Sequence, residues 1–209
     1  KAKNIEIVSI EEFPAKTVDL TTELLRLKNN GAEYVFIQVL PAAIISAFKS
    51  ADRIDYNPMF LGTWTSTDPD FFKMGEGLIR DRLKMQFPGG LPVDHTEGIR
   101  LMKELWDRYK TVNSFDTAYW EGVVVAMVME RAFIRAQEKY GKIDAETINK
   151  AMESFTNEDF GGLVPNITYT KEDHGASFTA RIVQVHEDGT FSPLTNFYVP
   201  GKEKIEILK

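Results

Sequence analysis

The sequence predicts an α/β fold with βαβ units that form a parallel sheet and with a β-hairpin near the C-terminus. Two observations lead to this expectation. Between residues 5 and 66, short β-branched and aromatic runs alternate with segments of helical periodicity. Further on, an alternating segment at 179–185 precedes Asp188-Gly189, a pair of residues typical of tight hairpin turns.

The first half of the chain predicts three strands and two helices in strict alternation. We expect strands at Ile5–Ile10, Tyr34–Leu40 and Met59–Leu61. Asp19 is the predicted cap of the first helix. The second helix carries Ile44, Ile45 and Phe48 on one side. Because βαβ crossovers are right-handed, these strands form a parallel sheet whose carboxyl ends share one edge.

The second half is richer in helices. Residues 78–87 predict a further strand, and the Pro- and Gly-rich residues 87–92 predict a linker. Three helices are expected after it: one at about 94–109, a long apolar one at 114–139, and a third that Asp144 caps. Residues from 160 onward predict a β-rich tail that contains the hairpin.

Composition excludes several classes of protein. The chain has 209 residues, of which 43% are hydrophobic, so that it can bury a substantial core. A net charge of −6 and a pI near 5.2 argue against nucleic-acid binding, which needs a concentrated positive surface. With no cysteine, disulfides and thiolate metal sites are excluded. No run approaches the length of a membrane span, and residues 1–10 lack the apolar core of a secretory signal.

Two loops are the candidate ligand contacts. Leu40-Pro41-Ala42 and Trp64-Thr65-Ser66 each follow a predicted parallel strand, so both lie at the same edge of the sheet. In open α/β sheets, small molecules bind just beyond the carboxyl ends of the strands. The alternative is an ordinary βα loop in which Trp64 covers the core.

Catalytic patterns are scarce. The three histidines show no metal-ligand spacing, and the chain has no nucleophile elbow or glycine-rich phosphate loop, so we expect no metal and no cofactor. His174, beside Asp173, could act as a general base, but a hydrogen bond that fixes its loop is the favoured interpretation. His186 is expected at a strand end that faces solvent. For Glu121, a structural ion pair is favoured over catalysis.

A succession of motifs resembles one known family. The motifs are Asn57-Pro58-Met59-Phe60-Leu61-Gly62-Thr63-Trp64, Tyr119-Trp120-Glu121-Gly122-Val123, Glu130-Arg131-Ala132, Phe160-Gly161-Gly162-Leu163-Val164-Pro165, Thr168-Tyr169-Thr170, Asp173-His174-Gly175, Ile182-Val183-Gln184-Val185 and Asp188-Gly189. In order and spacing the chain resembles the type I periplasmic solute-binding proteins of ABC importers, in the branched-chain amino acid (leucine/isoleucine/valine) class.

The resemblance implies two Rossmann-like lobes that close on a ligand about a hinge. It assigns residues 1–88 to lobe 2, 89–176 to a segment of lobe 1, and 177–209 to the crossover and the return to lobe 2. It also implies a truncated chain, in which the core of lobe 1 and the first βα unit of lobe 2 are missing. A fragment of this kind would expose apolar surface, so we expect loose packing between its parts or a homodimer that covers the 114–139 helix.

The resemblance further implies binding without catalysis, a permease partner, and a periplasmic or extracellular location. Tyr119 joins the two loops as a ligand-contact candidate on this ground. Amino-acid binders of the family often carry an acid at the position of Trp64, so the resemblance favours an aromatic or aliphatic carboxylate over an amino acid. The alternatives are a sensory or regulatory domain of the same fold and an enzyme that uses His174 and Asp173.

Overall fold

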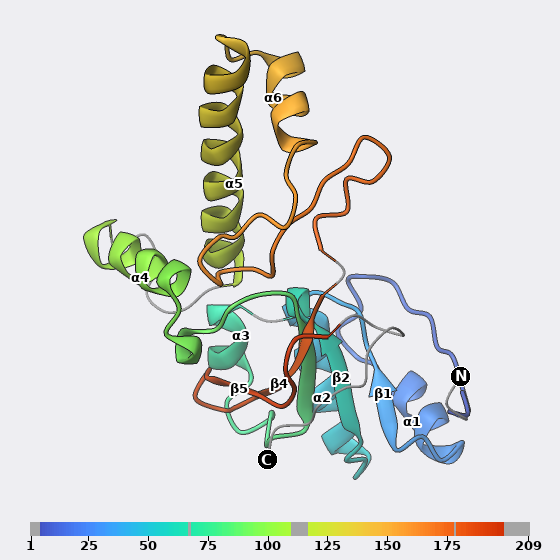
Figure 1. Ribbon diagram of the computed structural model, residues 1–209. Helices are drawn as coiled ribbons and strands as arrows, with labels where there is room; N and C mark the ends of the chain where they lie inside the picture. The colour runs from blue at the N-terminus through green and yellow to red at the C-terminus, as the bar shows by residue number, and fades with distance from the viewer. Residues whose placement is uncertain (1–4, 67, 110–116, 178, 199–209) are drawn as a thin grey trace. The chain divides into compact units, whose positions relative to one another are not determined.

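The computed structural model describes residues 5–66, 68–109, 117–177 and 179–198, and the chain divides into two compact units (Figure 1). The sheet unit comprises residues 1–86 and 182–193. The helical unit comprises residues 87–181 and 194–209. Two segments far apart in sequence therefore build each unit.

A five-stranded sheet with the order β1-β2-β3-β4-β5 forms the centre of the sheet unit (Figure 1). Its strands are β1 (Tyr34–Phe36), β2 (Met59–Thr63), β3 (Leu83–Phe87), β4 (Arg181–Val185) and β5 (Phe191–Pro193). β1 pairs in parallel with β2, and β2 with β3, which confirms the predicted parallel sheet. β4 and β5 pair antiparallel around Gly189, which has a φ of 82°, and this confirms the predicted hairpin.

Three helices accompany the strands of the sheet unit: α1 (Thr21–Asn29), α2 (Pro41–Arg53) and α3 (Pro69–Met74). The fully buried rings of Phe48 on α2 and Phe60 on β2 meet edge to face at 4.9 Å, and they hold α2 on the sheet. The guanidinium of Arg82 lies 4.9 Å from the centre of the Phe48 ring. Asp19 accepts a hydrogen bond from the N–H of Thr21, although Leu20 is the residue at the N-cap position of α1.

Three expected strands differ from the structure. Ile5–Ile10 is not a strand: Ile5, Ile7 and Ile10 are 78%, 74% and 79% exposed, because no neighbouring strand among the described residues pairs with them. β1 ends at Phe36 rather than Leu40, since its partner β2 turns into a 3-10 helix beyond Thr63. β3 begins at Leu83 rather than 78, because Arg80 and Asp81 have positive φ and form a turn.

The described part of the helical unit is mainly α-helical. A 3-10 turn at Pro92–Asp94 precedes α4 (Glu97–Tyr109), α5 (Thr117–Tyr140) and α6 (Ala145–Met152). The predicted start of the second helix, 114–116, lies outside the described residues. Asp144 caps α6 as expected, and the N–H of Thr147 donates to its carboxylate. The strands of the predicted β-rich tail begin only at β4, and residues 153–177 contain a single described bridge, between Glu158 and Ile167.

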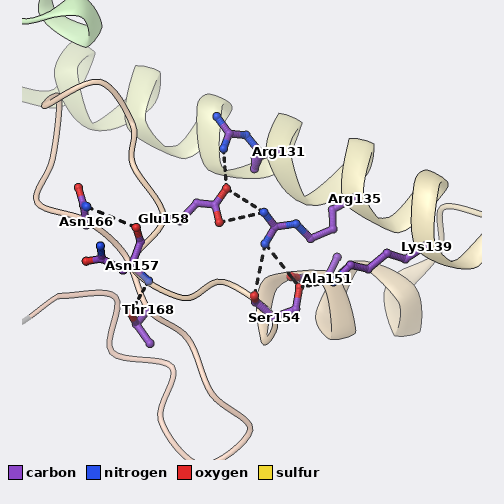
Figure 2. A network of polar contacts seen from close by, with 9 residues as sticks. All are labelled: Arg131, Arg135, Lys139, Ala151, Ser154, Asn157, Glu158, Asn166 and Thr168. Carbon is purple, nitrogen blue, oxygen red and sulfur yellow. Dashed lines mark hydrogen bonds and ion pairs between the residues drawn. The ribbon is translucent and has the colours of Figure 1, made fainter.

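A polar network fastens α5 to the segment after α6 (Figure 2). Arg131 and Arg135 project from one side of α5, and both donate to the carboxylate of Glu158. Arg135 also reaches the backbone carbonyl and hydroxyl of Ser154, just beyond the end of α6. These contacts hold α5 against the segment that follows α6, and no strand pairing joins the two. We therefore interpret the network as structural.

The Pro- and Gly-rich linker packs tightly within the helical unit. The indole N–H of Trp120 donates to the carbonyl of Leu163 at 3.1 Å, and the indole lies directly over Gly89. A Cβ at Gly89 would sit 2.0 Å from an indole carbon. The glycine is therefore required here for close packing rather than for flexibility.

Candidate functional site

The two predicted ligand loops lie side by side at the carboxyl ends of β1 and β2. The hydroxyl of Ser66, which is fully buried, donates to the backbone carbonyl of Val39 at 2.9 Å. Val39 immediately precedes Leu40-Pro41-Ala42, and Ser66 closes the Trp64–Ser66 3-10 turn. This bond joins the loop that follows β1 to the loop that follows β2, so the edge predicted from sheet topology exists as a single surface.

The Trp64–Ser66 turn offers an aromatic ring and exposed hydroxyls. Trp64 is half-buried, Thr65 is exposed, and only Ser66 belongs to the core. The hydroxyl of Thr65 lies 2.9 Å from that of Thr63, so one of the two donates to the other. The turn thus places a half-buried Trp64, in sequence, between two threonines whose hydroxyls bond to each other, and these residue types can form one wall of a small-molecule site.

The other loop is the beginning of α2. Leu40 is the N-cap residue and is 71% exposed, and it provides no side-chain cap. Pro41 occupies the first turn and Ala42 follows it at the surface. A helix N-terminus carries partial positive charge on its backbone N–H groups, which favours a negatively charged partner.

None of the six residues in the two loops is titratable. Their chemistry is limited to hydroxyl and backbone hydrogen bonds, an indole N–H and apolar contact. Such groups can orient a small organic molecule, but they cannot exchange a proton with it near neutral pH. The loops are therefore suited to binding rather than to acid–base catalysis.

Tyr119 lies on α5 in the helical unit. Its hydroxyl donates to the carbonyl of Met102 on α4, at 3.5 Å, and its side chain is half-buried. This contact connects α4 to α5. The role of Tyr119 in ligand contact stays a prediction from the family resemblance.

The histidines expected in loops have structural partners. His174 lies 3.2 Å from the carboxylate of Glu153, while Asp173 accepts from the N–H of Gly175 within the same loop. Hydrogen bonds that fix this loop, which was the favoured interpretation, are therefore present. Glu121 is exposed, so solvent satisfies its charge.

One constellation was missed at the sequence level. Nδ1 of His186 lies 2.8 Å from Asp81, and Nε2 lies 2.8 Å from the hydroxyl of Ser192. A carboxylate, an imidazole and a hydroxyl thus contact one another in the same order as in the Asp-His-Ser triad of acyl-transfer enzymes. However, the side chain of Asp81 is 70% exposed, and the three residues line neither of the two cavities described next. His186 directly follows the end of β4, as predicted, and its side chain is 32% exposed.

The described part of the chain contains apolar cavities, and two of them are considered in turn. One, of about 610 Å³, lies in the sheet unit between residues 5–13, α1 and β1. The other, of about 310 Å³, lies in the helical unit against Trp120, Val128 and Tyr169. Neither includes the predicted ligand residues.

Two kinds of feature are absent from the residues that the structure describes. No cluster of three or more histidine, aspartate or glutamate side chains is arranged to hold a metal ion. No helix in this part of the chain combines the length and the hydropathy that a membrane crossing requires.

Comparisons with known proteins bear on the whole chain. The profile of a family described as periplasmic binding protein matches residues 1–190. No curated protein matches the chain in sequence.

Three solved structures of similar fold illustrate the likeness. A branched-chain amino acid ABC transporter from Thermus thermophilus with bound valine has a TM-score of 0.81 and 25% identity, covering 94% of this chain and 53% of the other. A fatty acid ABC transporter substrate-binding protein from Thermomonospora curvata has a TM-score of 0.77 and 16% identity, and the match covers 92% of this chain and 50% of the other. A leucine-binding protein from Thermotoga maritima has a TM-score of 0.73 and 16% identity, and the match covers 90% of this chain and 51% of the other. The chain thus spans about half the length of these structures.

Proposed function

This chain belongs to the periplasmic binding protein family, and on that premise we propose that it forms part of the solute-binding component of an ABC importer, located outside the cytoplasm. The observation that carries the proposal is the surface made by the two loops that the Ser66–Val39 hydrogen bond joins. It lies at the carboxyl ends of parallel strands, where α/β proteins bind small ligands. The protein acts by binding and release to a permease, without catalysis.

The proposed ligand is a small aromatic or aliphatic carboxylate. The N–H of Ala42 at the start of α2 and the hydroxyls of Thr63 and Thr65 can donate to a carboxylate, whereas Pro41 has no N–H and those of Ala43 and Ile44 donate to the carbonyl of Leu40. Trp64 offers an apolar face, and neither loop supplies an acid that could pair with the ammonium group of an amino acid. Among the similar structures, one holds bound valine and another belongs to a fatty acid ABC transporter, so both an amino acid and an aliphatic carboxylate occur among the ligands of this fold.

Isothermal titration calorimetry tests the ligand class. The complete protein is titrated with leucine, valine, phenylacetate, benzoate and hexanoate, and thermal-shift measurements repeat the panel. Binding of the carboxylates, with the two amino acids at least tenfold weaker, is the expected result. Tight leucine or valine binding with inert aromatic acids would refute the preference but leave solute binding intact.

We also propose the lobe assignment that the resemblance implies: residues 1–88 in lobe 2, 89–176 in lobe 1, and 177–209 as the return to lobe 2. Support comes from two boundaries of the compact units, at residues 86–87 and 181–182, whereas residues 194–209 fall in the helical unit rather than in the sheet unit. Hinge motion requires two parts that each keep their own core. Two compact units are consistent with lobes of this kind.

Two copies of the chain could pair through α5. Val125, Phe133 and Ile134 are exposed apolar residues on this helix, and exposed apolar surface favours association. Multi-angle light scattering of the chain and of its Val125→Lys variant tests the pairing. A monomeric mass for both proteins would exclude it.

A further inference from the structure

The backbone passes three times between the sheet unit and the helical unit, at residues 86–87, 181–182 and 193–194. We call the chain on the helical side of these points the first, second and third connections: residues 87–94, 179–181 and 194–198. On the other side, β3, β4 and β5 run up to the same three points, and they are neighbours in the sheet. Strand pairing therefore holds the three crossings together within the sheet unit.

Within the helical unit, the guanidinium of Arg181 contacts all three connections. Arg181 belongs to the second connection, and it donates to both carboxylate oxygens of Asp94 in the first. It also donates to the carbonyl of Gly89 in the first connection, at 3.0 Å. The central carbon of the guanidinium lies 4.7 Å from the centre of the Phe197 ring in the third. A planar guanidinium that binds a carboxylate with two nitrogens and also lies over a ring is fixed in direction as well as in place.

Backbone hydrogen bonds strengthen this junction. The N–H of Ala180 donates to the carbonyl of Tyr198 at 3.0 Å, and the N–H of Tyr198 donates back to Ala180 at 2.8 Å. This bridge pairs the second connection with the third, directly beside Arg181 and Phe197. In the first connection, the N–H of Leu91 donates to the carboxylate of Asp94, so the partner of Arg181 is held on its own segment.

The ion pair at the junction is shielded from solvent. The side chain of Arg181 is 6% exposed and that of Asp94 is 21% exposed. Burial raises the pKa of Asp94, but the hydrogen bonds from Arg181 and from the Leu91 N–H lower it overall, so the carboxylate stays ionised. Separating a buried pair leaves a charge without its partner, which costs far more than separating an exposed pair. The pair is therefore expected to persist while other parts of the chain move.

We propose that Arg181 is a positioning residue for the motion between the two units: it holds the three connections as one rigid bundle, so that bending is confined to the residues at the three crossing points. The inference rests on the proposed function, because capture of a solute requires such a motion, but Arg181 itself acts without touching the solute. A hinge is a small number of residues that absorb a large change in φ and ψ. Without Arg181, each connection could bend by itself, and the two units would sample a wider range of orientations.

Distance measurements test this role in the 209-residue chain, which contains all three connections. The chain has no cysteine, so spin labels can be attached at Lys49→Cys and Glu138→Cys, which replace exposed residues of α2 and α5. Double electron–electron resonance without solute then gives the distribution of distances between the units. Arg181→Met should widen this distribution at least twofold. Glu158→Gln is the control, because it removes a different ion-pair network of the helical unit and should leave the width unchanged.

Phe197→Ala provides a second variant, which keeps the ion pair and removes only the contact with the third connection. Phe197 is 36% exposed, so this variant should fold, and it should widen the distribution less than Arg181→Met does. Circular dichroism shows which variants are folded.

Three results would overturn the proposal. They are a wild-type width in folded Arg181→Met, a wild-type width in Phe197→Ala, and a widening by Glu158→Gln equal to that by Arg181→Met, which would reflect general loosening of the helical unit. Because no solute is present, the outcome is independent of the calorimetric panel. A protein that binds none of the solutes would refute the proposed function, whereas the widths alone decide the role of Arg181.

Discussion

The hydroxyl of Ser66, at the end of the turn after β2, donates a hydrogen bond to the carbonyl of Val39 in the loop after β1. The two residues are 27 positions apart in the sequence, and the bond is partly buried. It fixes the distance between Trp64-Thr65 and the start of α2. A ligand held by both loops would therefore meet a preorganised surface, which lowers the entropic cost of binding.

Replacing Ser66 by alanine should weaken both the fold and the proposed site. The Val39 carbonyl loses its buried donor, so the free energy of unfolding should fall by about 1–3 kcal/mol. Affinity for the carboxylate panel should fall as well, because the two loops are no longer joined. Urea unfolding and calorimetry measure these effects. Ser46→Ala is the matched control, since Ser46 bonds to the Ala42 carbonyl on the exposed surface of α2 and should change neither quantity appreciably.

Trp64 should determine the apolar part of ligand recognition. Trp64→Ala removes a ring beside the two threonine hydroxyls, and the affinity for aromatic and aliphatic carboxylates should fall at least tenfold. Trp64→Phe keeps an apolar ring and should retain most of the affinity. If Trp64→Ala binds the panel as wild type does while its unfolding free energy drops, the ring covers the core and does not contact the ligand.

Elements that depend on local sequence were predicted well. The β4–β5 hairpin follows from Asp188-Gly189, the cap of α6 follows from Asp144, and β2 follows from an apolar run after Asn57-Pro58. Ile5–Ile10 has the pattern of a strand, but a strand also needs a neighbour with which to pair, and none is present among the described residues. Periodicity reports which side chains could be buried, not whether a partner is there to bury them.

In the candidate site too, one part could be predicted from the sequence and another could not. The two loops could be placed together because strand order and crossover handedness fix the edge at which they lie. The sequence could not place Asp81, His186 and Ser192 together. Asp81 and His186 are 105 positions apart, and their contact depends on the turn at Arg80-Asp81. The contact with Ser192 depends on the register between β4 and β5. Short-range sequence patterns do not predict contacts between residues so far apart in the chain.

Gly89 and Gly122 should respond in opposite directions to the same substitution. Gly89→Ala places a Cβ 2.0 Å from the Trp120 ring, and overpacking of this kind costs about 1–3 kcal/mol. Gly122→Ala adds a Cβ on α5 with nothing within 4 Å, so helix propensity should stabilise the chain by about 0.5–1 kcal/mol. Urea unfolding distinguishes them. Equal effects from the two variants would contradict the packing of Gly89 against the indole.

Glu158 should be the most sensitive residue of the network that joins α5 to the segment after α6 (Figure 2). Its side chain is 12% exposed, and two arginines donate to it. Burial alone would raise its pKa, but the hydrogen bonds from Arg135 and Arg131 lower it overall, so the carboxylate stays ionised. Glu158→Gln should reduce the unfolding free energy by about 1–3 kcal/mol. Glu146→Gln, which removes the exposed pair with Lys150, is the control and should change it far less.

The cap of α6 should make stability depend on pH in the acid range. The pKa of Asp144 is lowered from 3.8 to about 2, because Lys142 and the N–H of Thr147 donate hydrogen bonds to its carboxylate. Since the folded pKa is below the unfolded one, the stabilisation is complete above pH 3.8 and is lost as the pH falls through about 2.

Asp144→Asn isolates this contribution, because asparagine is also a good N-cap residue but carries no charge. The melting temperature of the wild type should fall more steeply than that of the variant between pH 4 and pH 2, and the two curves should converge at the acid end. Asp19, whose pKa is also lowered to about 2, titrates in both proteins and cancels in the difference. Circular dichroism melts at half-unit pH steps provide the comparison. Parallel curves over this range would show that the charge of Asp144 contributes nothing to α6, and that its oxygen alone is the cap.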